Sequence, residues 1–273
     1  MSPIRQFYDS EGVPLRIDGP PEEPATAWRS QRARVRSWLE SLPDPDWAGA
    51  TRCGLWDVTS LVRHLASGSQ FLGYTLHRGA AGTATTLLQG FDPHATVQAA
   101  AAMLGEMTPA AAREAMAAMD AAVDRELETM ARAGWSTMAE APPGQLPAHL
   151  SVNHFLFDSW VHEYDLMVPR GERPYVDVRE ASVVVRYLLG LASVTTASET
   201  PLDVRLCDPE IRVGVDVANG QVRVAPSVPS RAAVLEGRLV DVVDRATGRE
   251  AGPIDGDQRA LAVLDTFGAL LAG

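Results

Sequence analysis

The chain has 273 residues, a hydrophobic fraction of 46% and a formal net charge of −11, typical of an acidic globular protein with a substantial core. This charge disfavours nucleic acid as a partner, because binding a phosphate backbone requires concentrated positive charge. All basic residues are arginine, which excludes a Schiff-base lysine and a phosphate-binding loop that depends on lysine.

The chain has neither a membrane-spanning apolar run nor an N-terminal pattern typical of a signal peptide. We therefore expect a cytoplasmic protein without a membrane partner. Cys53 and Cys207 are far apart in the sequence, which favours two free thiols over a disulfide.

The first 175 residues alternate between turn-forming stretches and helical patterns. Residues 1–24 are rich in proline, glycine and charge, and predict an extended N-terminal arm. Apolar residues at helical spacing then predict helices at about 25–42, 57–77 and 109–133, with a short one after Pro93 and loops between them. A further helix is expected at 151–168, with the Ser151 hydroxyl as its N-terminal cap.

The helix at 151–168 is apolar over most of its circumference but carries one polar line. His154, Asp158, His162 and Asp165 follow at steps of four, four and three, which places them on one face. Two interpretations remain open. The line is either a solvated face or, because Asp158 and His162 at i and i+4 can reach one cation, part of a metal site.

A metal site would need a further ligand from another helix. His64 lies on the same side of the 57–77 helix as Leu61, toward the expected core. Taken alone, such a residue is more often a buried core histidine than a ligand. His77 and His94 are expected in surface or loop positions.

After residue 197 the hydrophobic period changes. Alternating apolar residues predict strands near 202–206, 211–217 and 221–224, and Asn219-Gly220 predicts a hairpin turn between the last two. A helix is expected before them at 177–197, and two after them at 230–246 and 256–271. We therefore expect an N-terminal arm at 1–24, a helix bundle at 25–197 and a small α+β domain at 198–273.

Two segments resemble a known family. TRCGLWDVTSLVRHL at 51–65 is similar to an opening with the pattern C-x-G-W-x-V-x-D-L-V-x-H-L, and DSWVHEYDLMVPRG at 158–171 is similar to E-x-x-x-H-x-x-D-L-x-x-x-x-G. These patterns are typical of the mycothiol-dependent maleylpyruvate isomerase family in the DinB-like superfamily. The resemblance spans about 25–270. It implies a mainly α fold, with a DinB-like four-helix bundle followed by a small C-terminal α+β domain.

The resemblance also implies a divalent metal, usually zinc, at His64, Asp158 and His162. Asp158 stands where many members have glutamate, which keeps the charge but shortens the side chain by one methylene. Leu55 interrupts the usual Gly-Trp pair.

The implied function is a metal-dependent thiol enzyme, with mycothiol as co-substrate in the transfer of a thiol to, or the isomerisation of, a small electrophile. His154 is the candidate acid or base. Trp56, Tyr74 and Trp160 are candidates for the walls of a mycothiol pocket, or else core aromatics. Asp165 either orients a metal ligand or caps local backbone.

Two alternatives from other classes remain. The chain is a metal-free bundle that binds a small molecule or a partner without catalysis, or a metal enzyme of secondary metabolism that uses no thiol. Metal content and thiol dependence distinguish the three hypotheses.

Overall fold

The computed structural model describes residues 5–8, 13–54 and 56–272. They form two compact units, which are treated separately below. The first unit is Pro24–Tyr175, and the second combines Met1–Glu23 with Val176–Gly273. The expected boundary near residue 197 is therefore wrong, because the division falls between Tyr175 and Val176. None of the described helices is both long and apolar enough to cross a membrane.

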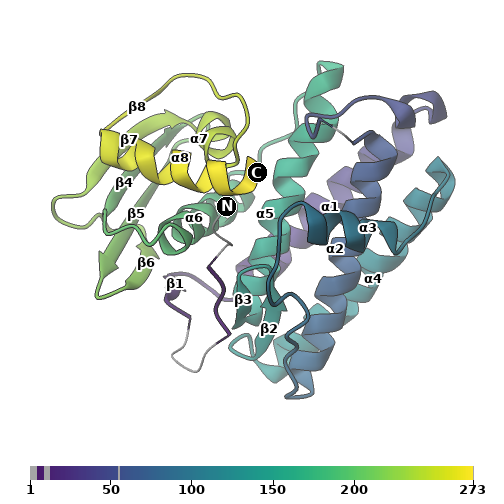
Figure 1. Cartoon of the computed structure of the whole chain (residues 1–273), viewed down its shortest axis with the longest axis horizontal. Helices are drawn as coiled ribbons and strands as arrows, with labels where there is room; N and C mark the ends of the chain where they lie inside the picture. Colours follow the sequence, from purple (N-terminus) through teal and green to yellow (C-terminus); the bar gives the residue numbers. More distant parts are fainter. Residues whose placement is uncertain (1–4, 9–12, 55, 273) are drawn as a thin grey trace. The chain divides into compact units, whose positions relative to one another are not determined.

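The first unit is a four-helix bundle, as predicted (Figure 1). Its long helices are α1 (Glu23–Ser41), α2 (Val58–Ala80), α4 (Pro109–Ala133) and α5 (Ala148–Met167). A 3₁₀ turn, η1 (Asp44–Ala48), and a short helix, α3 (Ala95–Ala102), lie in the connections. Helix α2 packs against both α4 and α5. Helix α2 therefore contacts two of the other three long helices of the bundle.

The connection expected to be a loop at 134–148 contains a hairpin instead. Strands β2 (Met138–Ala141) and β3 (Gly144–Pro147) pair antiparallel. The end of α2 approaches this hairpin so closely that a Cβ on Gly79 would collide with the carbonyl oxygen of Met138. The buried Glu140 carboxylate accepts hydrogen bonds from the Thr85 hydroxyl and the Leu88 amide, both at 2.6 Å. The hairpin thus ties the loop after α2 to the bundle.

Buried polar side chains also connect the helices. The Arg32 guanidinium on α1 donates to Asp120 on α4, from Nε at 3.1 Å and Nη2 at 2.9 Å. It also donates to the Ser159 hydroxyl on α5 at 2.9 Å. Arg32 is 1% exposed and Asp120 is 2% exposed, so this ion pair lies inside the bundle. It connects α1 and α4 to α5, one residue from Asp158.

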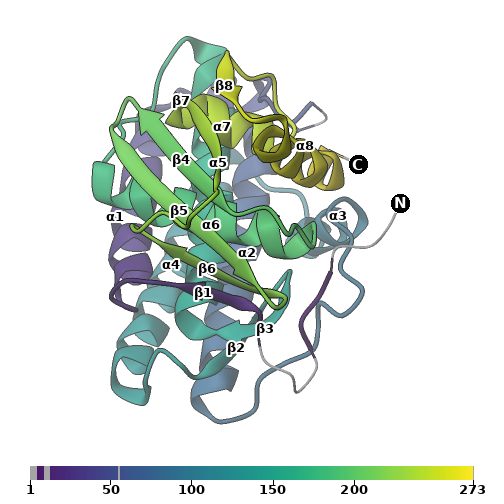
Figure 2. The ribbon, with the colours of Figure 1, turned by 90° about the vertical axis from the view of Figure 1, so that its left-hand side faces the viewer.

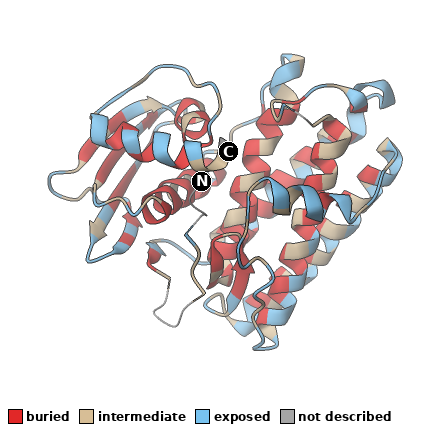
Figure 3. Ribbon diagram, viewed as in Figure 1, coloured by how far each residue is buried: buried red, intermediate tan, exposed pale blue. Residues whose placement is uncertain are grey.

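Helix α5 is the most thoroughly buried long helix of the bundle (Figure 3). It begins three residues before the expected cap, at Ala148, and the cap position is Pro147. Ser151 is therefore inside the helix, where its buried hydroxyl donates to the Ala139 carbonyl oxygen at 3.2 Å. The prediction of Ser151 as the cap is wrong, because the hydroxyl is used for packing against β2.

The second unit is a six-stranded sheet with helices packed on it (Figure 2). The strand order is β1-β6-β5-β4-β7-β8. The strands are β1 (Leu15–Ile17), β4 (Leu202–Cys207), β5 (Ile211–Ala218), β6 (Gln221–Ala225), β7 (Ala233–Arg238) and β8 (Ile254–Gly256). Helices α6 (Val178–Thr195), α7 (Leu239–Ala246) and α8 (Gln258–Ala272) contact its strands or one another.

The N-terminal arm and the helix at 178–195 both belong to this second unit. Strand β1 pairs parallel with β6, so part of the arm forms the edge of the sheet. Helix α6 packs on β1 and β6 so closely that a Cβ on Gly190 would lie 2.6 Å from Leu15 Cδ1. This packing explains why α6 belongs to the α+β unit rather than to the bundle.

The three predicted strands pair with one another, and the hairpin at Asn219-Gly220 is confirmed, since Ala218 pairs with Gln221. The helix expected at 230–246 is only half present, because Ala233–Arg238 forms strand β7 beside β4 and only Leu239–Ala246 is helical. The apolar residues of this segment serve both patterns, and pairing with β4 selects the strand for the first half.

Candidate metal centre

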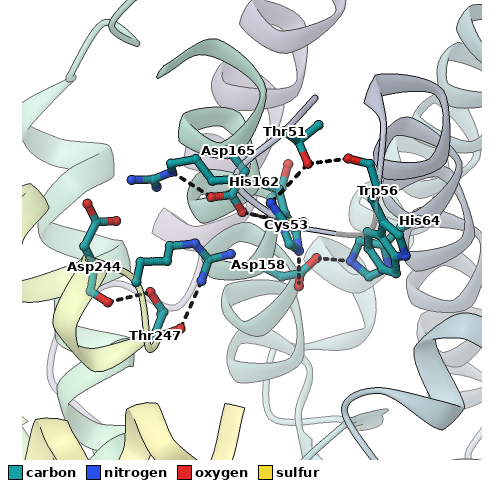
Figure 4. Close-up of polar contacts among 12 residues, drawn as sticks. Thr51, Cys53, Trp56, His64, Asp158, His162, Asp165, Asp244 and Thr247 are labelled. Carbon is teal, nitrogen blue, oxygen red and sulfur yellow. Dashed lines mark hydrogen bonds and ion pairs between the residues drawn. The ribbon is translucent and has the colours of Figure 1, made fainter. Parts of the chain in front are cut away.

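Helices α2 and α5 bring three predicted metal ligands together. His64 Nε2 on α2 lies 3.3 Å from Asp158 Oδ2 on α5, and His162 Nε2, one turn further along α5, lies 3.5 Å from Asp158 Oδ1 (Figure 4). The two imidazole rings meet edge to face, with centroids 4.9 Å apart. The three ligand atoms lie within 4.8 Å of one another. Two segments that are distant in the sequence therefore supply one group of possible metal ligands.

These residues fit a divalent cation. Two nitrogen or oxygen ligands on one tetrahedral zinc are about 3.3 Å apart, since each bond is about 2.0–2.1 Å long. His64 Nε2 is buried, and its contact with Asp158 Oδ2 at 3.3 Å does not have hydrogen-bond geometry. A buried imidazole nitrogen without a well-formed hydrogen bond is costly, and a metal ion at this position would satisfy it.

Mutual electrostatics hold the site in a charged state. Burial opposes ionisation of Asp158, but the His64 and His162 rings outweigh it and keep the pKa of this carboxyl well below its usual range. Burial likewise opposes protonation of His162, but Cys53, Asp158 and Asp165 outweigh it and raise the pKa of this ring well above its usual value. A negative carboxylate between two imidazoles is a suitable environment for a cation.

The other side of the His162 ring faces a second group of residues. His162 Nδ1 lies 2.9 Å from Asp165 Oδ2, and the Cys53 thiol donates to the same oxygen at 3.1 Å. Cys53 Sγ is also 3.5 Å from His162 Nδ1. Arg52 Nε donates to the other oxygen, Asp165 Oδ1, at 2.9 Å. Asp165 is fully buried, so its charge is compensated inside the protein.

The segment that carries Arg52 and Cys53 is closed by its own hydrogen bonds. The backbone at Ala50 bridges to Asp57, the residue whose side chain caps α2 by accepting from the Ser60 amide at 2.8 Å. The Thr51 hydroxyl donates to the Trp56 carbonyl oxygen at 2.7 Å. The Trp56 ring then lies over His64, with centroids 5.2 Å apart. The departure at Leu55 lies outside the described residues.

The same segment, together with the turn that follows α5, supplies hydrogen-bond donors to the end of α5. The last four carbonyl groups of a helix lack partners within it. Here the Asp165 carbonyl oxygen accepts from the Arg52 amide at 3.1 Å, and the Leu166 carbonyl oxygen accepts from Arg170 Nη1 at 2.7 Å. The Met167 carbonyl oxygen accepts from the Glu172 amide at 3.3 Å. The carboxyl end of α5, which carries two metal-site side chains, is therefore fixed from outside.

The other candidate residues divide into two groups. Trp56 and His154 lie near the three ligands. Trp56 contacts His64, and His154 is half-buried one turn before Asp158. Burial lowers the pKa of His154 to about 4, against the opposing effect of Asp158.

The structure does not bring Tyr74 and Trp160 to the site. Tyr74 is 48% exposed and ten residues beyond His64 on α2, about 15 Å along the helix axis. Trp160 is 1% exposed and packs on Tyr164 with centroids 4.6 Å apart. Because it is two residues after Asp158, it points about 200° away around α5. Trp160 is thus a core aromatic, and Tyr74 is a surface residue.

The sequence analysis does not predict two residues of the site, Arg52 and Cys53. The cysteine at the start of the 51–65 pattern is the signal for Cys53, and Arg52 has no comparable signal. Both cysteines are free thiols, as predicted.

A family model described as the mycothiol maleylpyruvate isomerase N-terminal domain matches residues 28–167, just over half of the chain. The chain belongs to this family. The matched segment contains His64, Asp158, His162, and both Arg52 and Asp165.

Two solved structures share the fold of this family member. One is described as the mycothiol-dependent maleylpyruvate isomerase, and the other as a mutant of it in which one histidine is replaced by alanine. Each is 18% identical, with a TM-score of 0.61, and the alignment covers 88% of this chain and 94% of the other. The similarity extends over both parts of the predicted architecture. No curated protein matches the chain.

Proposed function

We propose that this family member is a metal-dependent thiol enzyme that uses mycothiol to isomerise, or to transfer the thiol to, a small electrophilic substrate. Family membership supports mycothiol as the thiol, and the name of the structurally similar enzyme supports isomerisation. The observation that carries the proposal is the convergence of the buried His64 Nε2 with Asp158 and His162 in one group of possible metal ligands.

His64, Asp158 and His162 would hold the metal, and zinc suits a set of two imidazoles and one carboxylate. A divalent metal held there would act as a Lewis acid and would lower the pKa of a thiol in the site. The Asp158 carboxylate contributes the negative charge that favours cation binding. The Trp56 ring packs on His64 and restricts its rotation.

His154 would handle a proton as a base rather than as an acid. With a pKa of about 4 its ring is neutral at physiological pH, so it can accept a proton but has none in excess to donate. It is half-buried on the same face of α5 as Asp158, which places it within reach of a substrate bound beside that carboxylate.

The first test is metal content. We expect about one divalent ion per chain in protein purified without chelator, and loss of most of it in His162→Ala. His77→Ala is the matched control, because His77 is an exposed histidine on the same helix as His64 and should not affect metal content. A parent protein without metal would favour the metal-free, non-catalytic alternative, whereas equal metal in His162→Ala and the parent would refute the assignment of His162 as a ligand.

The second test is thiol dependence. With maleylpyruvate as the probe, turnover should rise with added mycothiol, disappear with a strong chelator and return when zinc is restored. Asp158→Asn preserves the shape of the ligand while removing its charge, so turnover should fall in parallel with metal occupancy. Full turnover without any thiol would refute the mycothiol assignment in favour of a thiol-independent metal enzyme.

A further inference from the structure

The His162 ring contacts two different environments through its two nitrogens. Nε2 faces Asp158 within the three-ligand group, whereas Nδ1 faces Asp165 Oδ2 at 2.9 Å. An ionised carboxylate accepts hydrogen bonds only, so the proton between Nδ1 and Asp165 belongs to the ring. The other nitrogen, Nε2, faces Asp158 and is the atom that a cation would contact after displacing its proton.

We propose that Asp165 is a positioning residue for the metal ligand His162, itself held in place by Arg52. This inference rests on the proposed function, because it assigns a role within the same metal site. Asp165 would fix both the orientation of the ring and the tautomer that presents Nε2 toward Asp158.

The alternative role for Asp165, as a cap for local backbone, has less support. Its side-chain oxygens accept from Arg52 Nε at 2.9 Å, from the Cys53 thiol at 3.1 Å and from His162 at 2.9 Å, all of which are side-chain groups. The link to the backbone is made instead by the Asp165 carbonyl oxygen, which accepts from the Arg52 amide. These three contacts direct the carboxylate at the His162 ring and at the side chains of residues 52 and 53.

A second cation site between Cys53, His162 and Asp165 is also disfavoured. Their ligand atoms lie within 4.8 Å of one another, so distance alone permits one. However, the Arg52 guanidinium already compensates the Asp165 charge at 2.9 Å, and the site would place a cation close to this group. Metal at Nδ1 would also require loss of the ring proton that Asp165 accepts.

Arg52 solves the problem of burying Asp165. An unpaired carboxylate that is fully buried would be strongly destabilising, whereas the ion pair makes the Arg52–Asp165 unit neutral. The Arg52 backbone is in turn hydrogen-bonded to α5, so the guanidinium is held from the same loop. The His162 ring is thus contacted by a carboxylate whose charge Arg52 compensates.

The test compares metal affinity and ring protonation in the parent, Asp165→Ala and Cys53→Ala. Affinity for zinc is measured by competition with a chromophoric chelator. The His162 ring N–H is observed in ¹⁵N NMR spectra of the zinc-loaded protein. Asp165→Ala should bind zinc about 10–100-fold more weakly, the range found for lost outer-shell partners, and its ring N–H should exchange faster with solvent.

Cys53→Ala is the matched control, because it removes a neighbour of Asp165 Oδ2 but keeps the hydrogen bond from His162. It should bind zinc within a few-fold of the parent, with unchanged stoichiometry. The cobalt-loaded parent should lack a thiolate-to-cobalt charge-transfer band. Two metals per chain, or such a band lost in Cys53→Ala, would overturn the positioning role in favour of a second metal site.

The outcomes also separate this inference from the proposed function. A parent that binds no zinc overturns both. A parent that binds zinc, with unchanged affinity and ring exchange in Asp165→Ala, overturns only the positioning role. Lower stability of Asp165→Ala with unchanged zinc affinity would show a purely structural role, and Asp165→Asn, which retains an acceptor oxygen, should recover part of the lost affinity if positioning is correct.

Discussion

The helix bundle should be sensitive to loss of either partner of the buried ion pair between Arg32 and Asp120. Asp120→Asn is nearly isosteric but replaces a carboxylate that accepts from two Arg32 nitrogens, at 3.1 and 2.9 Å, and from the Ser69 hydroxyl at 2.9 Å. The variant also removes the counter-charge of Arg36, whose Nη1 donates to Asp120 at 2.6 Å. The Arg32 guanidinium, only 1% exposed, would remain buried without its counter-charge.

Breaking a buried pair by removing one partner costs about 3–5 kcal/mol, because an uncompensated charge is left behind. The same two helices offer a matched control in Arg29 and Asp124, which lie 3.1 Å apart but have side chains 42% and 43% exposed. Asp124→Asn should therefore cost at most about 1 kcal/mol. The two pairs share residue types and helices, and they differ in burial and in the number of partners that each carboxylate has.

Chemical denaturation followed by circular dichroism measures both variants, with the dependence on denaturant compared to detect loss of two-state behaviour. We expect Asp120→Asn to lower the free energy of unfolding several times more than Asp124→Asn. Equal small losses would refute the reasoning, because they would mean that the interior pair stabilises the fold no more than the surface pair does.

Two further predictions concern packing and pH. Gly79→Ala should lower stability by about 1–3 kcal/mol, because its Cβ would collide with the Met138 carbonyl oxygen. Gly68→Ala in the same helix should be neutral or stabilising, because its Cβ would make ordinary contacts, and thermal melts compare the two variants. The folded-state pKa of His154 is about 4, below the usual 6.5, so between these values the unfolded chain binds a proton that the folded chain does not. Metal-free parent protein should therefore lose up to about 3 kcal/mol as pH falls from 6.5 to 4, and His154→Phe should lose less; equal pH dependence in denaturation experiments would contradict the assignment.

Helical periodicity was a good guide where one pattern alone fitted the segment. The helices at 58–80 and 109–133 agree with their predicted ranges within a few residues, because each has one apolar face and a side-chain cap. Asp57 and Thr108 each accept from the amide three residues on, a local interaction that sequence reveals.

The errors arose where the deciding interaction is distant in sequence. Helix α6 is apolar on many sides and would suit either unit, so only its packing against β1 assigns it to the sheet. The residues 233–238 form a strand because β4 lies beside them, and the hairpin at 138–147 pairs only four residues on each side. Neither pairing leaves a clear local signal.

The site shows the same division. The spacing of Asp158 and His162 predicts that both lie on one face, and the resemblance to the family supplied His64. No spacing rule places Arg52 beside Asp165, because their contact joins residues 113 positions apart. Tyr74 and Trp160 are aromatic residues of the two ligand-bearing helices, which suggested pocket walls. Their positions along and around those helices separate them from the ligands.

The distance between the two ligand-bearing segments also has a consequence during synthesis. His64 precedes Asp158 by 94 positions in the chain. At a translation rate of about 5–20 residues per second, His64 leaves the ribosome about 5–20 s before its partners. During that interval Cys53 and His64 lack the α5 residues that contact them in the folded bundle. The proposed three-ligand site is complete only when α5 has been made and packed, so metal capture there would be among the last events in the maturation of this unit.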